Sequence, residues 1–329
     1  MNSDMLASNK SSHGKGALRS SSGLPYGKIN VYMTSSFRIK EKLIQGLFGT
    51  LAFSSLIFLV GIVFVLFKEG LPIFQDVKIS DFLFGKFWYP TYDPAEFGIL
   101  PLIVASFFVS LGAMFVCVPL GIGSALYINE IASHKQKMIL KPLIEILASV
   151  PSIIYGFFAM AILAPFLQKT FNIPIGLCAL NASIILGIMA TPTVCSIAED
   201  ALSYVPRSFR EASFAVGATR WQTLIKVVIP AAGSGISTAI ILGMSRAIGE
   251  TMTVLMAAGG AAMIPTSAFD PVRPMTAAIA AEMGEAPMGG DHYHALFAIA
   301  LVLFIVTFLF NILAEIISRR FRIKLGLSG

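Results

Sequence analysis

Two oppositely charged side chains, Arg246 and Glu250, stand four residues apart within an otherwise apolar run, residues 227–263. Charged groups are costly to place in hydrocarbon and usually face a bundle interior or a cavity, so they mark pathways. A spacing of four residues brings two side chains together on one helical face. Arginine offers a planar fork of donors that matches phosphate oxygens and stays charged at physiological pH. The pair predicts an oxyanion path inside a membrane; the alternative is a self-neutralised ion pair that only holds helices together.

Glu250 has two predicted roles in such a path. Its carboxylate neutralises Arg246 when the path is empty, and it can accept a hydrogen bond from a protonated phosphate oxygen. The second role favours hydrogenphosphate over a fully ionised oxyanion such as sulfate. The hydroxyls of Ser245 and Thr251 stand next to the two charges, so we expect them to touch the path as well. The other small residues of the run predict close helix packing; they are Ser234, Gly235, Ser237, Thr238, Gly243 and Gly249.

The chain that positions these residues is strongly apolar. Of its 329 residues 56% are hydrophobic and 13% are charged, whereas a soluble domain carries about 25% charged residues. A helix of about 20 residues crosses the hydrocarbon core of a bilayer. The sequence therefore predicts an all-α integral membrane protein with six transmembrane helices. The expected spans are residues 43–67, 98–128, 146–167, 173–198, 230–258 and 295–317.

The positive charges indicate the orientation of these spans. Eighteen of the 24 Lys and Arg residues fall before the first span, in alternate connections and in the tail after the last span. Cytoplasmic segments retain such residues, so both termini are predicted to be cytoplasmic. This asymmetry accounts for most of the net charge of +6, and we expect membrane lipid rather than nucleic acid as a partner. Residues 1–40 predict a disordered cytoplasmic tail without a cleaved signal peptide, and residues 41–329 a transmembrane domain.

The third span and the first connection contain further signals. Pro151 and Gly156 interrupt the regularity of the span, as is tolerated where protein or a water-filled cavity surrounds the backbone. Lys141 and Glu145 are spaced to pair on a helix near the inner interface, or else to extend separately into the interfacial layer. The aromatic residues around Trp88 predict an interfacial layer at the outer face, with a contact surface for a partner as the alternative.

Residues 203–226 form the most informative connection. Ser208 and Glu211 are spaced as a capping box for a short helix, which Gly217 can end in a left-handed conformation. Thr219 and Gln222 form a second capping box, for a helix that continues towards residue 230 and beyond. The pattern predicts two helices meeting at a sharp elbow on the cytoplasmic side. It indicates either a moving part or an ordinary connection between spans.

Other classes of function lack their signatures. There is no Gly-x4-Gly-Lys-Ser/Thr loop for ATP phosphates, and no His-Glu-x2-His or Gly-x-Ser-x-Gly motif of an enzyme. The cysteines fall in apolar runs and the histidines outside them, without metal-ligand spacing, so we expect this chain to bind no cofactor or metal. A secondary transporter or channel working alone is the alternative from another class. It is disfavoured because a single span carries the Arg/Glu pair and no repeat is visible.

The elbow resembles the EAA loop of bacterial ABC importer permeases. The matching residues are Glu211-Ala212-Ser213, then after three residues Gly217, and after nine more Val227-Val228-Ile229-Pro230. Ser213 replaces the usual Ala, and Ile229 replaces the usual Leu. The resemblance implies a type I ABC importer permease fold, in which this loop is a coupling helix that docks on a separate ATPase. The coupling residues that it implies are Arg210, Glu211, Ala212, Gly217, Arg220 and Trp221.

A second resemblance concerns the substrate. The string Arg246-Ala247-Ile248-Gly249-Glu250-Thr251-Met252 is similar to the C-type permease subunit of phosphate ABC importers, as are residues 69–72, 151–156 and 279–286. This implies that Arg246 and Glu250 act in phosphate translocation in the bacterial inner membrane. The implied partners are a homologous A-type permease, an ATPase dimer that binds ATP and Mg, and an extracytoplasmic phosphate-binding protein. Importers of molybdate or phosphonate are the alternative, which the Arg-to-Glu string disfavours.

Overall fold

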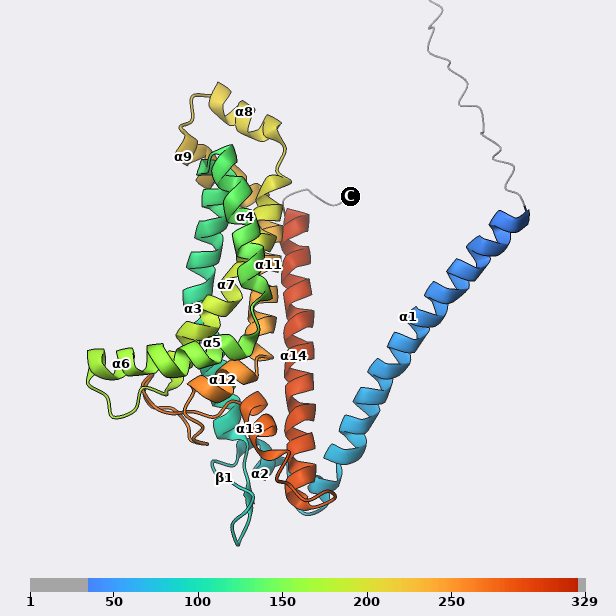
Figure 1. Cartoon of the computed structure of the whole chain (residues 1–329), viewed down its shortest axis with the longest axis vertical. Helices are drawn as coiled ribbons and strands as arrows, with labels where there is room; N and C mark the ends of the chain where they lie inside the picture. Colours follow the sequence, from blue (N-terminus) through green and yellow to red (C-terminus); the bar gives the residue numbers. More distant parts are fainter. Residues whose placement is uncertain (1–34, 325–329) are drawn as a thin grey trace, which may run out of the picture. The chain divides into compact units, whose positions relative to one another are not determined.

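The computed structural model describes the backbone of residues 35–324 and the side chains of residues 42–316 (Figure 1). Most of the predicted N-terminal tail therefore lies outside the described residues. The chain divides into two units, Met1–Phe58 and Leu59–Gly329. In the first unit, the described residues belong to helix α1, Ser35–Gly70, so residues 35–40 of the predicted tail are helical. The helical core and the candidate site belong to the second unit.

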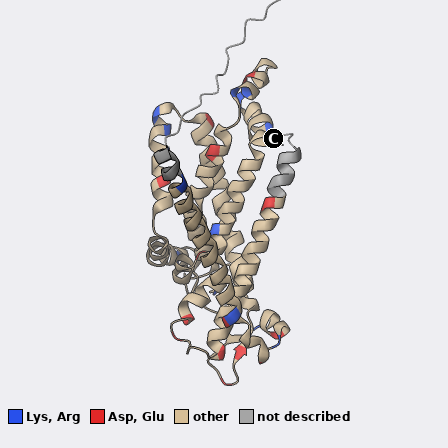
Figure 2. Ribbon diagram, turned by 90° about the vertical axis from the view of Figure 1, so that its right-hand side faces the viewer, with Lys and Arg blue, Asp and Glu red and all other residues tan. Residues whose placement is uncertain are grey.

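The predicted all-α membrane architecture is confirmed for the part of the chain that the structure describes. Five helical segments are long and apolar enough to cross a membrane, and a sixth is added when one bent pair of helices counts as a single span. Four of these elements are α1, α3 (Leu100–Leu126), α7 (Ala179–Ser203) and α14 (Asp291–Lys324). Figure 2 shows that the Lys, Arg, Asp and Glu residues of the second unit lie mostly near the ends of its long helices.

The main core forms where α3, α7 and α11 (Gly233–Ile248) pack against one another. Many of its buried residues are alanine, glycine or serine, which let helix backbones approach closely. Ser183 on α7 illustrates this packing, because its hydroxyl lies 3.4 Å from the carbonyl oxygen of Val109 on α3. A closely packed frame of helices thus surrounds α11, the helix that carries Arg246.

The third predicted span, residues 146–167, is interrupted near its start at Pro151, and the helical segment long enough to cross a membrane is Ser152–Phe171. Helix α4 (His134–Ser149) ends at Val150, and α5 (Ser152–Phe158) begins after Pro151. Proline disfavours a helical conformation in the residue before it, and Val150 is extended with a ψ of 129°. From α5 the chain continues through a π-helical turn, Ala159–Leu163, into α6 (Ala164–Phe171). Figure 1 shows α5 and α6 crossing the direction of α4 and the long helices.

The approach to α11 is also bent. The elbow consists of α8 (Arg207–Ala215) and α9 (Arg220–Thr223), followed by a π-helical turn, Leu224–Val228, and the short α10 (Ile229–Ala231). The segment Arg220–Ala231 meets α11 at an angle of 69°. The prediction of one helix from the elbow to Arg246 is therefore wrong. Pro230 lacks the backbone N–H that a continuous helix would use, and the bend follows directly after it.

The opposite end of the unit, here called the hairpin end, carries short elements. They are a 3-10 turn Pro72–Gln75, α2 (Ile79–Phe84), strands β1 (Trp88–Tyr89) and β2 (Glu96–Phe97), α12 (Met252–Ala257) and α13 (Met275–Glu282). The strands pair antiparallel, with Trp88 opposite Phe97. The Trp88 side chain is 2% exposed within a second apolar core. Trp88 is thus a core residue and not part of the predicted interfacial layer, whereas the neighbouring Phe87, Tyr89 and Tyr92 are exposed.

One carboxylate, Glu282, joins the elements of the hairpin end. It accepts hydrogen bonds from the indole N–H of Trp88 at 3.0 and 3.2 Å and forms an ion pair with Arg273. It also lies 2.9 Å from Nε2 of His292, at the start of α14. The distant strand β1 and the segments on either side of α13 therefore meet at a largely buried charge.

We expect Glu282→Ala to lower thermal stability, because it leaves the Arg273 charge and the Trp88 N–H without their partner. Removing one member of a buried pair costs about 3 kcal/mol, which corresponds to a fall in Tm of about 5–10 °C for a domain of this size. The measurement is thermal unfolding of the purified chain in detergent. Glu285→Ala, which removes an exposed carboxylate three residues away, is the matched control. Equal shifts for the two variants would contradict the role of Glu282.

Candidate functional site

Arg246 lies in the last turn of α11, and the helix ends two residues later at Ile248. Glu250 stands in the break between α11 and α12 rather than on the same helix. The predicted arrangement on one helical face is therefore wrong. Within the described residues no ion pair joins Arg246 to Glu250, and the Arg246 side chain is exposed. A cation in this position interacts favourably with the carbonyl end of the α11 dipole.

The Glu250 carboxylate bonds instead to the first turn of α12. Its Oε1 atom lies 3.3 Å from both the backbone N and the hydroxyl of Thr253. Its backbone carbonyl accepts a 2.8 Å hydrogen bond from Thr276, in the first turn of α13. Glu250 thus fixes where α12 begins and how it connects to α13.

The break at Glu250 meets the break at Pro151. The Thr253 hydroxyl lies 2.9 Å from the carbonyl oxygen of Ser152, the first residue of α5. A Cβ atom added at Gly156 would lie 2.9 Å from Sδ of Met256, so glycine permits the close approach of α5 to α12. Two interrupted helices therefore converge where Arg246 and Glu250 lie.

Tyr155 adds a polar group to this junction. It is close enough to Arg246 for an electrostatic interaction between the two side chains. Its hydroxyl donates a 3.0 Å hydrogen bond to the carbonyl of Leu147, in the last turn of α4. Sequence reasoning did not single out Tyr155, Ser152 or Thr253, although the proline at 151 was a signal that this backbone is irregular.

The two hydroxyl residues predicted to touch the path differ in their surroundings. Ser245 donates a 2.8 Å hydrogen bond to Asn311, so its side chain faces α14. The Thr251 hydroxyl lies 3.4 Å from the carbonyl oxygen of Gly249, within the break. The structure thus brings Thr251 to the same break as Glu250, and Ser245 to a packing contact with α14.

The elbow has the predicted turn but a different start. Gly217 has a φ of 81°, a conformation that glycine adopts without strain. The capping box of Thr219 and Gln222 is present, as predicted. The capping box expected at Ser208 is absent from α8, which begins at Arg207 after Pro206. Ser208 already lies inside the helix and so cannot act as its N-cap.

Arg210 faces the transmembrane helices rather than the outer surface of the elbow. Its guanidinium lies 2.6 Å from Oε1 of Glu130, which belongs to the π-helical turn Tyr127–Ile131 after α3. It also donates a 2.8 Å hydrogen bond to the carbonyl of Val205, just beyond α7. Glu130 was not among the predicted site residues. The ion pair joins α8 to the end of α3, and the hydrogen bond joins it to the end of α7.

The remaining predicted coupling residues are exposed on the elbow: Glu211, Ala212, Gly217, Arg220 and Trp221. Trp221 is 67% exposed and the neighbouring Val216 is 84% exposed. Beneath them the two arms of the elbow are joined by a buried hydrogen bond of 2.9 Å between the hydroxyls of Ser213 and Thr223. Ser213, which replaces the usual alanine, therefore has a hydrogen-bond partner on the opposite arm of the elbow.

Comparison with known proteins establishes the family. Residues 117–323 match the family described as "Binding-protein-dependent transport system inner membrane component". The chain belongs to this family of transport permeases. It is accordingly a multi-pass component of an inner-membrane transport system, and the predicted type I ABC importer permease fold is confirmed.

The relatives of this permease include proteins named for phosphate transport. It is 38% identical to "Probable ABC transporter permease protein YqgH" of Bacillus subtilis, over 79% of this chain and 85% of that protein. It is 33% identical to "Phosphate transport system permease protein PstC" of Mesorhizobium japonicum, over 82% and 88% of the two chains. A solved bacterial ABC transporter that imports alginate has the same fold, with a TM-score of 0.62 at 15% identity over 85% of this chain and 96% of that one.

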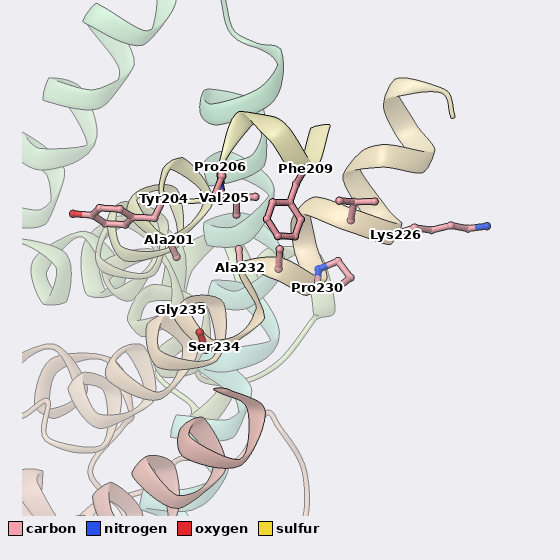
Figure 3. A pocket seen from close by; sticks show the side chains of 12 residues that line it. Ala201, Tyr204, Val205, Pro206, Phe209, Lys226, Pro230, Ala232, Ser234 and Gly235 are labelled. Carbon is pink, nitrogen blue, oxygen red and sulfur yellow. The ribbon is translucent and has the colours of Figure 1, made fainter. Parts of the chain in front are cut away.

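The permease has an apolar cavity of about 570 Å³ beside the elbow (Figure 3). Figure 3 shows the Phe209 ring among the lining residues, while the Lys226 amino group points away from them. The walls come from the end of α7, from α8 and from the bend before α11. They offer little to an anion, so the polar junction at Arg246 remains the better candidate for the substrate. The cavity leaves free volume between the elbow and the base of α11.

Two further charged side chains of the permease, Lys141 and Asp270, have hydrogen-bond or ion-pair partners within the protein. Lys141 forms ion pairs with Glu199 at 2.7 Å and Asp200 at 3.3 Å, both on α7, instead of the predicted pair with Glu145. At the hairpin end, hydrogen bonds from the Thr266 hydroxyl and from backbone N–H groups hold the pKa of Asp270 below its usual range. Within the described residues no cluster of His, Cys, Asp and Glu could hold a metal ion.

Proposed function

We propose that this permease is the C-type membrane subunit of an ATP-driven phosphate importer and forms half of its translocation path. The observation that carries the proposal is the placement of Arg246. Its side chain is exposed where two interrupted helices meet, and within the described residues it has no hydrogen bond or ion pair. Intramembrane charges in such places mark substrate pathways. The phosphate-transport names of several relatives support phosphate as the substrate.

The chemistry of the path follows from the guanidinium. Its planar donors bind two oxygens of one phosphate at once, which a lysine ammonium cannot do with the same geometry. Glu250 stands on the next turn of chain, where its carboxylate accepts a hydrogen bond from a protonated phosphate oxygen and repels a fully ionised anion. Thr251 lies in the same break and supplies a hydroxyl. The substrate of this site is therefore hydrogenphosphate.

Energy comes from ATP hydrolysis on a separate ATPase dimer, since this chain carries no Gly-x4-Gly-Lys-Ser/Thr loop. The exposed face of the elbow, with Trp221 and Arg220, is the contact for one ATPase subunit. Aromatic and arginine side chains are enriched among residues that dominate protein interfaces. Arg210 positions the elbow from within, through Glu130. The chain itself binds no cofactor; ATP and Mg belong to the ATPase.

The orientation and the other partners complete the assignment. Both termini and the elbow lie on the cytoplasmic side, because lysine and arginine gather there. The hairpin end faces outward and receives phosphate from an extracytoplasmic binding protein. A homologous A-type permease supplies the other half of the path.

The test is substrate uptake by the complete complex, with both permeases, the ATPase and the binding protein, in liposomes. We expect uptake of radiolabelled phosphate that depends on ATP, without uptake of sulfate or molybdate. A preference for molybdate would show that the complex is an importer of another oxyanion. Phosphate movement by this chain alone, without the ATPase, would indicate a secondary transporter.

A further inference from the structure

Thr253 is the polar residue that links the two helix breaks. It is 0% exposed, yet its hydroxyl lies 2.9 Å from the Ser152 carbonyl and 3.3 Å from the Glu250 carboxylate. Its backbone N–H lies 3.3 Å from the same carboxylate oxygen. A buried hydroxyl needs a partner. The two oxygen acceptors belong to the junction, and the sulfur of Met189 on α7 lies farther away, at 3.6 Å.

These contacts determine where the Glu250 charge lies. Arg246 is only four residues away in sequence and is the natural counter-ion for this carboxylate. An attraction between opposite charges grows as the local dielectric constant falls, so pairing is favoured in a membrane once nothing holds the carboxylate elsewhere. In the structure the carboxylate is bonded to the first turn of α12. Within the described residues Arg246 forms no ion pair with it.

A free guanidinium and a paired one differ in what they can bind. An arginine that already shares its fork with a carboxylate has fewer donors left for an oxyanion and less net charge to attract it. The position of the Glu250 carboxylate therefore sets the affinity of Arg246 for the substrate. Whatever holds the carboxylate on α12 keeps the anion site open.

We propose that Thr253 is a positioning residue that holds the Glu250 carboxylate on α12 and thereby keeps the Arg246 guanidinium open to hydrogenphosphate. This inference rests on the proposed function and adds a residue that does not itself touch the substrate. Its single hydroxyl proton is shared between the Glu250 carboxylate and the Ser152 carbonyl oxygen, so one side chain connects the carboxylate to α5. The two contacts make the affinity for phosphate depend on the alignment of both breaks.

The experiment compares Thr253→Val, Thr253→Ser and Glu250→Gln, and the double variant of Thr253→Val with Glu250→Gln, in the complete complex in liposomes. Valine matches the shape of threonine without the hydroxyl. The loss of a hydrogen bond to a charged group is equivalent to about a tenfold change in a binding constant. We therefore expect Thr253→Val to raise the KM for phosphate about tenfold with a smaller change in the maximal rate. Thr253→Ser keeps the hydroxyl and should restore a KM near that of the unmodified complex.

The double variant separates positioning from packing. If the hydroxyl acts through the Glu250 charge, Thr253→Val should have little further effect on KM once residue 250 is neutral. An equal rise in KM with and without the Glu250 charge would overturn the proposal, as would an unchanged KM in Thr253→Val. If Thr253→Val does not assemble, Thr253→Ala and Thr253→Ser give the same comparison.

Failure of this inference and failure of the proposed function give different results. Loss of uptake in Arg246→Ala together with an unchanged KM in Thr253→Val leaves the phosphate path standing and removes only the role of Thr253. An absence of phosphate uptake by the unmodified complex overturns both.

Discussion

Replacing Arg246 with alanine is expected to lower ATP-dependent phosphate uptake at least about 100-fold. Two hydrogen bonds between the guanidinium and an anion are worth about 3 kcal/mol, which is a factor of about 100 in rate or affinity. The same side chain is exposed where the breaks at Pro151 and Glu250 converge. Without it, α11 carries no Lys or Arg side chain. The measurement is initial uptake of labelled phosphate by the complete complex in liposomes.

Two further variants show whether the effect depends on the planar guanidinium or only on a positive charge. Arg246→Lys keeps a positive charge without the planar fork, so we expect uptake between that of the unmodified complex and that of Arg246→Ala. Lys169→Ala removes an exposed cation from α6 and serves as the matched control, with uptake unchanged. Normal uptake in Arg246→Ala, with the complex assembled, would remove Arg246 from the path and leave the permease fold intact.

Replacing Arg210 with alanine is expected to separate ATP hydrolysis from transport. The 2.6 Å pair with Glu130 is largely shielded, with 19% and 21% of the two side chains exposed. A shielded, hydrogen-bonded pair holds geometry better than a surface pair, which typically contributes less than about 1 kcal/mol. Without it, α8 loses its ionic attachment to the end of α3. We expect phosphate transported per ATP hydrolysed to fall about tenfold, while ATP hydrolysis continues.

The choice of variants distinguishes a positioning role from direct contact with the ATPase. Glu130→Gln should reproduce the loss of coupling, because it weakens the same pair from the membrane side. Exchanging the charges, with Arg210→Glu and Glu130→Arg together, should recover part of it. Arg207→Ala, an exposed arginine on the same helix, is the control for loss of charge. If Arg210→Ala uncouples transport and Glu130→Gln does not, Arg210 contacts the ATPase itself.

Local signals made the elbow predictable from sequence. The left-handed Gly217 and the capping box at Thr219 each depend on residues within a few positions, and both are present. The start of α8 was misjudged because a serine and a glutamate three residues apart also occur inside helices. The proline at 206 decides the start of the helix, and Ser208 falls within it.

The junction at Arg246 was predicted only in part. Its two charges were found from their position in an apolar run, but their arrangement was not. A helix end at Ile248 and a carboxylate turned toward Thr253 depend on contacts with α5, about a hundred residues earlier in the chain. Spacing within one segment carries no information about such contacts. The same limit explains why Lys141 pairs with Glu199 on another helix and why Glu282 was missed.

The bend at Ala232 determines how movement of the elbow is transmitted to the proposed anion site. Because the segment before the bend meets α11 at 69°, a push on the elbow tilts α11 more than it slides it along its axis. Arg246 lies thirteen residues along α11, about 20 Å from its base at a rise of 1.5 Å per residue. A tilt of about 5° therefore carries the guanidinium about 2 Å sideways, which exceeds the tolerance of a hydrogen bond. In the proposed path, a small rotation at the elbow is therefore enough to release an anion held by Arg246.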